Sequence, residues 1–417
     1  MIGDGDASNP ARRVVVIGGG AAGFFGAITC AESGRGLEVV LLEKGPQVLT
    51  KVRISGGGRC NVTHACFDPR ELARRYPRGG QALIGPLHRF QPRETVAWFE
   101  ARGVTLKTEE DGRMFPTTDS SETIVDCLTR GAREAGVRIE THAAVESIVR
   151  LPAGGFEVKV AGRPPLRADR VLVATGGCRS AAWGAIATSL GHTLEPPVPS
   201  LFSLHVTSPF LQGLAGVAID PVEVSAPGIP KPERGPILVT HEGVSGPAVL
   251  RLSAWGARIL HAADYRFPLR INWLPTENPG SLAEHFERRR AEQGARRVVN
   301  APIAPLTSRL WERLVLGSGI PREAQWSGLT REMRSALAAV LCGLELPVTG
   351  KTLNKDEFVT CGGIRLSEVH FKTMESRICP GLHFAGEVLD IDGITGGFNF
   401  QAAWTTGWLA GQAMAGG

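Results

Sequence analysis

The sequence predicts an α/β fold: a parallel-sheet domain made of two chain segments, with an inserted β-rich domain and a small helical subdomain. Three observations lead to this prediction. An apolar strand, a glycine turn and a helix open the chain at residues 13–34, and a similar pattern closes it at 381–417. Near Glu195 the pattern changes to prolines and short alternating strands. Strands followed by helices are typical of parallel sheets that are covered on both faces.

A chain of 417 residues suits two or three domains. The arginine-rich run 286–297 falls in a region with a helical pattern, and we interpret it as a solvated helix face, with an RNA-contacting patch as the alternative. The predicted order is: first segment of the parallel-sheet domain, 1–195; β-rich insert, 196–275; helical subdomain, 276–340; return to the insert, 341–355; second segment, 356–417.

Composition narrows the class of protein. The net charge of +5 is compatible with a polyanionic partner without indicating one. The eight cysteines are scattered and form no CxxC pair, so we expect reduced cytoplasmic thiols and no metal site. No signal peptide is recognisable at the start. The uncharged run Val14–Ala31 is long enough to span a membrane, but its glycines at motif spacing favour a buried strand and helix.

The first motif is GxGxxG, formed by Gly18, Gly20 and Gly23 with Ala22 inside the same turn. The first glycine allows a tight turn, the second lets the backbone approach a pyrophosphate, and the third lets the helix pack on the strand. Free N–H groups at a helix N-terminus favour phosphate. The motif therefore predicts a dinucleotide site, the alternative being a glycine-rich turn without a ligand.

Glu43 ends the next strand, twenty residues after Gly23, where it can accept hydrogen bonds from ribose hydroxyls. An acidic residue there suits an adenosine ribose without a 2′-phosphate, so the motif fits FAD or NAD. We assign Lys44 and Val145 to the same site. "VLVATGG" (171–177) is typical of a strand that passes under the cofactor, which adds Thr175 and Gly176.

The far end of the chain favours FAD. An apolar strand runs into Gly386 and Glu387, and a glycine loop and a helix follow. In flavoproteins with this pattern the acidic residue holds the ribityl chain, and the positive end of the next helix faces the flavin pyrimidine. Gly396, Gly397 and Asn399 would lie at that helix end. A strand, turn and helix without a ligand is the alternative.

Four stretches together resemble the BaiN/RdsA-type NAD(P)/FAD-dependent oxidoreductases, the HI0933-like flavoproteins. They are the glycine fingerprint, "SGGGRCNVT" (55–63), "VTHEGVSGPAVLRLS" (239–253) and "TMESRICPGLHFAGEVLDIDGITGGFNFQAAWTTG" (373–407). The resemblance covers nearly the whole chain and implies a two-segment Rossmann-like FAD-binding domain. It also implies hydrogen addition across a conjugated C=C bond, in a bile-acid enone or in ribosomal-RNA uridine. The chain departs from the family at "LTK" (49–51) and at His64, where an asparagine is common.

The stretch "KVRISGGGRCNVTH" (51–64) is where such enzymes fold a loop over the flavin. The bare backbone at Gly56 to Gly58 would lie against a flat ring, with Asn61 and Lys51 beside the cofactor. We expect Arg59 to orient the substrate.

Cys60, the next residue, would donate the proton that accompanies hydride transfer. The alternative for Cys60 is a buried packing residue. His64, Tyr76 and His241 are the rival proton donors.

The resulting hypothesis is an FAD enzyme that reduces an activated C=C bond with electrons from NAD(P)H. No second complete GxGxxG is visible, so NAD(P)H would bind transiently. The substrate would be a small enone or RNA, and we expect no membrane span. The alternatives are a flavin monooxygenase or dehydrogenase, and a non-catalytic RNA- or partner-binding flavoprotein.

Overall fold

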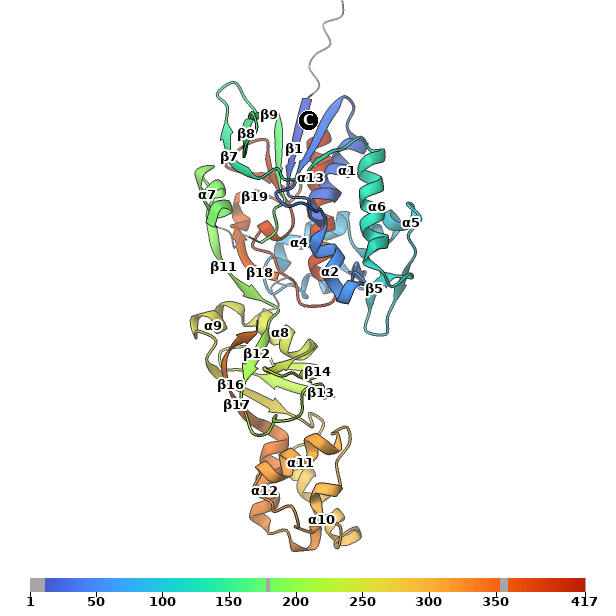
Figure 1. Cartoon of the computed structure of the whole chain (residues 1–417), viewed down its shortest axis with the longest axis vertical. Helices are drawn as coiled ribbons and strands as arrows, with labels where there is room; N and C mark the ends of the chain where they lie inside the picture. Colours follow the sequence, from blue (N-terminus) through green and yellow to red (C-terminus); the bar gives the residue numbers. More distant parts are fainter. Residues whose placement is uncertain (1–11, 178–180, 353–358, 417) are drawn as a thin grey trace, which may run out of the picture. The chain divides into compact units, whose positions relative to one another are not determined.

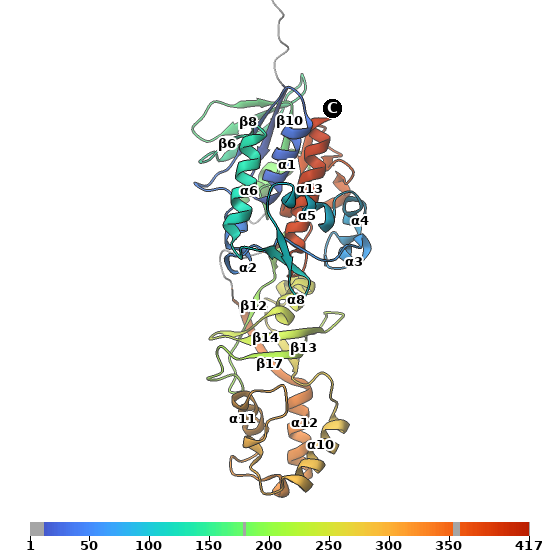
Figure 2. The same ribbon diagram turned by 90° about the vertical axis from the view of Figure 1, so that its right-hand side faces the viewer.

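The computed structural model describes residues 12–177, 181–352 and 359–416, so the predicted boundary at 355/356 lies outside the described residues (Figures 1 and 2). The chain divides into two compact units. The first comprises Met1–Val198 and Val359–Gly417, and the second comprises Pro199–Phe358. The first unit is thus assembled from two segments that lie far apart in the sequence.

A seven-stranded sheet forms the centre of the first unit, in the order β19-β20-β21-β10-β1-β2-β6. Pairing is parallel from β21 to β6, with Val14 opposite Val39 on one side and Arg170 on the other. The strands are β1 (Arg12–Ile17), β2 (Leu37–Leu42), β6 (Arg138–Glu140), β10 (Arg170–Val173), β19 (Val369–His370), β20 (Glu375–Ser376) and β21 (Leu382–Phe384). Continuous apolar runs such as 14–17 are buried, as a parallel sheet covered on both faces requires.

Helices α1 (Ala21–Ser33) and α13 (Phe398–Ala415) lie side by side (Figures 1 and 2). They approach so closely that a Cβ on Gly407 would lie 2.6 Å from the carbonyl oxygen of Ala22. The uncharged run Val14–Ala31 is therefore β1, a turn and most of α1. Among the described residues no helix is both long and apolar enough to cross a membrane.

Smaller elements complete the first unit. Two three-stranded antiparallel sheets, β3-β5-β4 and β7-β8-β9, and the pair β11-β18 flank the central sheet. Their strands are β3 (Thr63–His64), β4 (Leu106–Thr108), β5 (Arg113–Pro116), β7 (Val145–Arg150), β8 (Phe156–Val160), β9 (Leu166–Ala168), β11 (Leu194–Ser200) and β18 (Val359–Ile364). The remaining helices are α2 (Thr50–Gly58), α3 (Pro69–Ala73), α4 (Gly80–Arg89), α5 (Pro92–Glu100), α6 (Ser121–Glu134), α7 (Ala181–Ser189), and the 3₁₀ turns η3 (Leu366–Glu368) and η4 (Gly386–Val388).

The second unit contains a closed barrel in the order β12-β15-β14-β13-β16-β17. Its strands are β12 (Ser203–Val206), β13 (Ala218–Ser225), β14 (Glu233–Val239), β15 (Gly243–Ser245), β16 (Phe267–Asn272) and β17 (Leu344–Thr352). Its helices are α8 (Pro247–Trp255), α9 (Ala257–Ala262), α10 (Pro279–Glu292), α11 (Ser308–Gly317) and α12 (Arg331–Gly343), with 3₁₀ turns η1 (Val298–Asn300) and η2 (Trp326–Gly328). Trp273, Trp311 and Trp326 are fully buried in its core.

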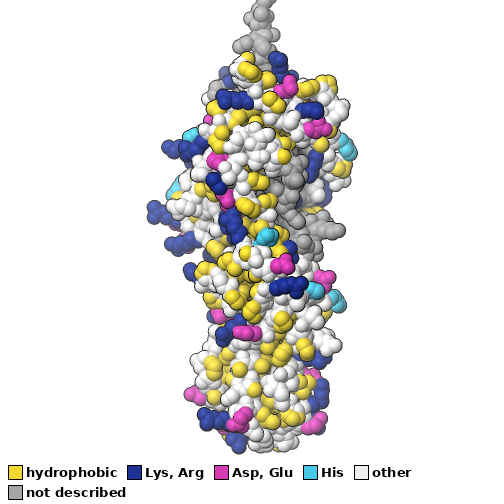
Figure 3. Space-filling model, turned by 90° about the vertical axis from the view of Figure 1, so that its left-hand side faces the viewer, with side chains coloured by type: hydrophobic (Ala, Val, Ile, Leu, Met, Phe, Trp, Pro, Cys, Tyr) yellow, Lys and Arg dark blue, Asp and Glu magenta, His cyan; other side chains and the backbone are white. Residues whose placement is uncertain are grey.

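The arginines of run 286–297 mostly have partners within the second unit. Arg289 donates to the carbonyl oxygens of Ala301 and Pro302 at 2.6 and 3.1 Å. Arg290 and Arg297 pair with glutamates, at 3.7 and 2.6 Å. On the face drawn in Figure 3, Lys and Arg side chains are interspersed with Asp and Glu. These contacts favour the solvated helix face over the RNA-contacting patch.

Buried histidines of the first unit predict acid sensitivity. Burial lowers the pKa of His383 to about 4, and the pKa of His192 is lowered by the same cause. Between about pH 6.5 and that value the unfolded chain therefore binds more protons than the folded protein. The contribution of these histidines to the free energy of unfolding is fully present above about pH 6.5. It falls as the pH drops, by up to ~1.4 kcal/mol per pH unit for each histidine.

Urea denaturation of the wild type and of His383→Asn at about pH 7.5 and about pH 5.5 measures this effect. The wild type should lose about 1 kcal/mol more than the variant on acidification. An equal loss in the two proteins would show that folding does not lower the pKa of His383.

Candidate cofactor site

The glycine loop joins β1 to α1. A Cβ on Gly18, whose φ is 111°, would lie 2.3 Å from the carbonyl oxygen of Ala174, and one on Gly23 would lie 1.9 Å from that of Gly18. A Cβ on Gly20 would meet nothing within 4 Å. The fold itself therefore requires Gly18 and Gly23, whereas Gly20 borders open space at the N-cap of α1. A ligand pyrophosphate would occupy that space.

Glu43 directly follows β2, and its carboxylate lies beside the glycine loop. It accepts hydrogen bonds from the backbone N–H groups of Gly19 and Gly45, at 2.8 and 2.7 Å. The backbone N–H of Ala143 donates to the carbonyl oxygen of Glu43 at 2.9 Å, which brings the start of β7, and with it Val145, to this edge of the sheet. The adjacent side chain of Lys44 is exposed.

The motifs from the two ends of the chain meet at Glu387. Its carboxylate lies 2.7 Å from Lys51 Nζ and accepts from the backbone N–H of Thr360 at 2.6 Å. The Glu387 side chain keeps 18% of its surface exposed. Gly386 packs against α1, because a Cβ on it would lie 2.8 Å from that of Ala22. The structure thus brings together residues that are 336 positions apart.

Thr175 and Gly176 follow β10, between the glycine loop and Glu387. Gly176 has a φ of 76°, and a Cβ on it would lie 3.8 Å from the Glu387 carboxylate. Within the described part of the chain, Thr175 Oγ1 is buried and has no hydrogen-bond partner. A buried hydroxyl without a partner is costly, and a ligand oxygen would satisfy it.

Replacing Thr175 by valine distinguishes the cost of the unsatisfied hydroxyl in the cofactor-free protein from its contribution to cofactor binding. Without cofactor, Thr175→Val should leave the free energy of unfolding unchanged or raise it by about 1 kcal/mol, because an unsatisfied hydroxyl is removed. Its affinity for FAD should fall about tenfold, the worth of one hydrogen bond. Calorimetric titration and urea denaturation measure the two quantities. Thr175→Ser is the control with wild-type affinity, and a Thr175→Val affinity equal to the wild type would remove Thr175 from the site.

The glycine run 56–58 is a left-handed turn at the end of α2. Gly56 and Gly57 have φ values of 59° and 68°, and Gly58 has a φ of 83°. The run falls within the bounds of α2, yet its backbone angles are not those of a right-handed helix. A Cβ on Gly57 or Gly58 would meet nothing within 4 Å. This bare backbone can therefore lie against a flat ring without a steric clash.

Cys60 and Arg59 both point toward protein groups. Cys60 is completely buried, and desolvation raises the pKa of its thiol to about 12, while a hydrogen bond with Ser55 opposes the rise. Arg59 lies 2.7 Å from Glu109 and 4.0 Å above the ring of Phe115. The burial of Cys60 favours the packing alternative, and the roles of both residues in catalysis stay predictions.

The N-terminus of α13 lies against the strand after the glycine run. Gly397, the N-cap, donates its N–H to the Asn61 side-chain oxygen at 2.9 Å, and the Asn61 amide donates to the carbonyl oxygen of Thr63 at 3.0 Å. Asn399 bonds both backbone groups of Gly393, at 2.8 and 2.9 Å. Gly396, with a φ of 132°, turns the chain into the helix. Asn61 and Asn399 thus hold the backbone around the helix end.

The rival proton donors differ in surroundings. His64 stacks on Phe398, with ring centroids 4.7 Å apart, and desolvation lowers its pKa. Tyr76 is buried, donates to the carbonyl oxygen of Phe398 at 2.7 Å, and has a pKa that burial raises. His241 is exposed and belongs to the second unit. His64 and Tyr76 therefore flank the start of α13, and His241 belongs to another part of the fold.

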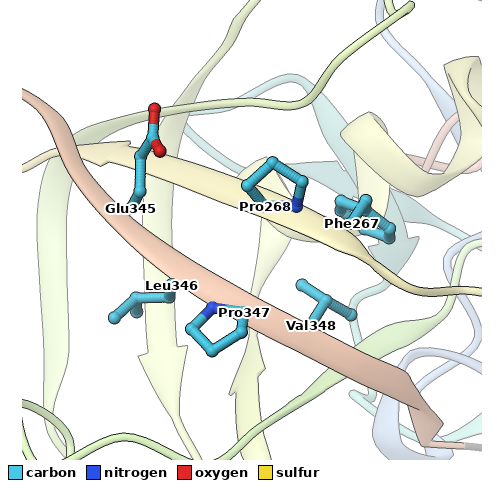
Figure 4. A pocket seen from close by; sticks show the side chains of 6 residues that line it. All are labelled: Phe267, Pro268, Glu345, Leu346, Pro347 and Val348. Carbon is cyan, nitrogen blue, oxygen red and sulfur yellow. The ribbon is translucent and has the colours of Figure 1, made fainter.

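Other parts of the described chain offer less for chemistry. No group of three or more His, Cys, Asp or Glu side chains suited to a metal ion occurs among the described residues, and the seven cysteines that they include are free. A shallow hollow on the surface of the second unit is lined by side chains of the paired strands β16 and β17 (Figure 4). It is lined by Phe267, Pro268, Glu345, Leu346, Pro347 and Val348. One carboxylate among apolar side chains does not resemble a nucleotide site.

Residues 12–413 match the family model described as the HI0933-like protein Rossmann domain. The chain belongs to the HI0933-like family. The predicted family is therefore confirmed, and so is the α/β fold class with a Rossmann-like domain and additional β-rich and helical parts.

Two relatives of this HI0933-like chain match over nearly their whole length. The 3-dehydro-bile acid delta(4,6)-reductase of Clostridium scindens is 31% identical over 421 residues, which cover 97% of this chain and 99% of that protein. The ribosomal RNA dihydrouridine synthase of Escherichia coli K12 is 30% identical over 409 residues, covering 96% and 97%. The two relatives thus carry names of different reactions at similar identity.

Among solved structures, the 3-ketosteroid-delta4-(5alpha)-dehydrogenase of Rhodococcus jostii RHA1 aligns with 99% of the HI0933-like chain and 98% of its own. The TM-score is 0.52 and the identity 16%. At this identity the likeness concerns the fold.

The sequence prediction missed several groups at the site. The N–H of Thr360 and the hydroxyl of Thr406, which accepts from Gly386 N at 2.9 Å, have no local sequence signal. Arg78 and Asp392 form an ion pair beside the loop before α13. Two aspartates in the apolar stretch "EVLDIDG" are a usable signal for that pair, because buried carboxylates need partners.

Proposed function

We propose that this HI0933-like chain binds FAD in its first unit and uses it to reduce a C=C bond conjugated to a carbonyl group, with electrons from NAD(P)H. The observation that carries the proposal is the contact between Lys51 and Glu387. It joins the glycine-run segment to the C-terminal motif beside Thr175 and the glycine loop. Relatives named as a reductase of a bile acid and as a dihydrouridine synthase support the reaction class.

The residues fit the cofactor in four respects. Gly20 leaves space at a helix N-terminus for the pyrophosphate, and Glu43 lies where ribose hydroxyls would donate. Thr175 supplies an unsatisfied hydroxyl, and Gly57 and Gly58 supply bare backbone. When bound, the flavin would supply the hydride that the reduction needs.

The reaction also needs a proton and an electron donor. One C=C bond takes up a hydride and a proton, and NAD(P)H is oxidised to NAD(P)⁺. The positive end of α13 would favour negative charge on the reduced cofactor. The substrate would be a small enone or the uracil ring of RNA, since both contain a C=C bond conjugated to a carbonyl group.

Anaerobic mixing with NADH or NADPH tests the proposal. The yellow absorbance of the reconstituted protein should bleach, and it should return when a conjugated enone or a uridine-containing RNA is added. A flavin that stays yellow with both nicotinamides would point to a structural cofactor. Return of the colour only with oxygen would point to an oxidase or monooxygenase.

Cys60→Ala tests the proton donor. Because the thiol is buried, we expect the variant to lose about 1 kcal/mol of stability and to keep FAD and turnover within about threefold. Stopped-flow reoxidation of the reduced protein by its substrate measures turnover. A loss of about 10²–10⁴-fold with FAD retained would instead establish Cys60 as the acid.

A further inference from the structure

The loop that leads into α13 is fastened to the segment before α4. Ile394 donates its backbone N–H to the carbonyl oxygen of Arg75 at 2.9 Å. Tyr76 donates its hydroxyl to the carbonyl oxygen of Phe398, the first residue of the helix, at 2.7 Å. A Cβ on Gly79 would lie 2.5 Å from Ile391, so the two backbones are close there. Residues 75–79 and 391–398 therefore pack as one piece.

A buried ion pair lies at the centre of this contact. Arg78 Nε donates to one carboxylate oxygen of Asp392 at 2.6 Å, and Nη2 donates to the other. The side chain of Asp392 is 0% exposed and that of Arg78 is 12% exposed. The same two residues also form an isolated antiparallel β-bridge. The backbone bridge and the side-chain ion pair thus both determine which residues of the two segments lie opposite each other.

The energetics indicate a positional role for the pair. Desolvating two charges offsets most of their attraction, so a buried pair often stabilises a fold no better than apolar side chains of equal volume. A guanidinium bound to a carboxylate through two parallel hydrogen bonds does fix orientation, because both groups are planar. The Arg78–Asp392 pair therefore contributes geometry more than stability.

The position of Asp392 is coupled to the N-terminus of α13 through the next residue in the chain. Gly393 follows Asp392 and is bonded through both backbone groups to Asn399, in the first turn of α13. A Cβ on Gly393 would lie 2.8 Å from Phe398 and 3.2 Å from Tyr76. A rotation of the backbone at Asp392 would therefore move the first turn of α13.

We propose that Arg78 and Asp392 are positioning residues that hold the N-terminal N–H groups of α13 toward the cofactor. This inference rests on the proposed function, in which that helix end faces the flavin. Because the first N–H groups of a helix lack partners within the helix and carry its positive end, their direction decides how well they favour the reduced, anionic cofactor over the oxidised one.

The test compares Asp392→Asn with Glu71→Gln. The control removes the carboxylate of an exposed ion pair, Glu71–Arg74, on the neighbouring helix α3. Hydrogen exchange of the Gly393 and Ile394 amides is measured first, without cofactor. We expect at least tenfold faster exchange in Asp392→Asn and no change in Glu71→Gln. Arg78→Lys keeps the charge but loses the two-bond geometry, so its exchange rates should lie between those of the wild type and Asp392→Asn. This variant still tests the inference if Asp392→Asn misfolds.

The reduction potential of bound FAD is measured second. We expect Asp392→Asn to bind reduced FAD, relative to oxidised FAD, about tenfold more weakly than the wild type does, a shift of about −30 mV for a two-electron couple. Unchanged exchange would overturn the inference, and so would faster exchange with an unchanged potential. A wild type that binds no FAD would overturn the proposed function instead, and the exchange measurement would still decide whether the pair holds the loop.

Discussion

Gly20→Val should abolish FAD binding while leaving the protein folded. A Cβ on Gly20 meets nothing within 4 Å, and its φ of −91° is accessible to valine, so the apo fold has room for the side chain. The same space is where the pyrophosphate must approach the backbone. We expect the dissociation constant for FAD to rise at least about 100-fold, or about 2.7 kcal/mol.

Two other glycine variants serve as controls for Gly20→Val. Gly328→Val, in the second unit, also has open space around its Cβ and should keep wild-type affinity. Gly23→Val should not fold, because its Cβ would lie 1.9 Å from the carbonyl oxygen of Gly18. Circular dichroism reports folding, and calorimetric titration with FAD reports affinity. Gly20→Val with wild-type affinity would place the cofactor elsewhere.

Glu387→Gln has the second largest expected effect. The substitution keeps an oxygen for the N–H of Thr360 but removes the charge that faces Lys51. A charge-assisted hydrogen bond to the cofactor is worth about 1.5–3 kcal/mol, so FAD affinity should fall by about 10- to 150-fold.

Glu375→Gln is the matched control for Glu387→Gln. Glu375 also accepts a backbone N–H, that of Gly381 at 2.8 Å, and it lies in β20, which pairs with β21, the strand that precedes Glu387. Fluorescence titration of the apoproteins with FAD compares the two variants. If both bind FAD as the wild type does, Glu387 serves only the ion pair with Lys51.

The cofactor motifs could be predicted because their chemistry is local. GxGxxG needs only a strand, a turn and a helix, and Glu43 follows at a fixed distance along the next strand. Gly386 and Glu387 repeat that local pattern at the other end of the chain. The contact of Glu387 with Lys51 was not predicted, because spacing along the chain does not determine which segments meet.

Side-chain orientation could not be predicted in the same way. Whether Cys60 faces a ligand or the core depends on the φ of 59° at that residue and on its contact with Ser55. Arg59 finds its partner, Glu109, fifty positions away, and Arg78 finds Asp392 at a separation of 314. Such pairs are determined by tertiary packing, which periodicity and spacing do not report.

The most direct test of the account is the identity of the cofactor that the protein releases. The purified chain, reconstituted if necessary, is denatured and the supernatant separated by chromatography. We expect FAD, close to one per chain, and its loss in Gly20→Val but not in Gly328→Val. Release of FMN, or no flavin after incubation with FAD, would contradict it.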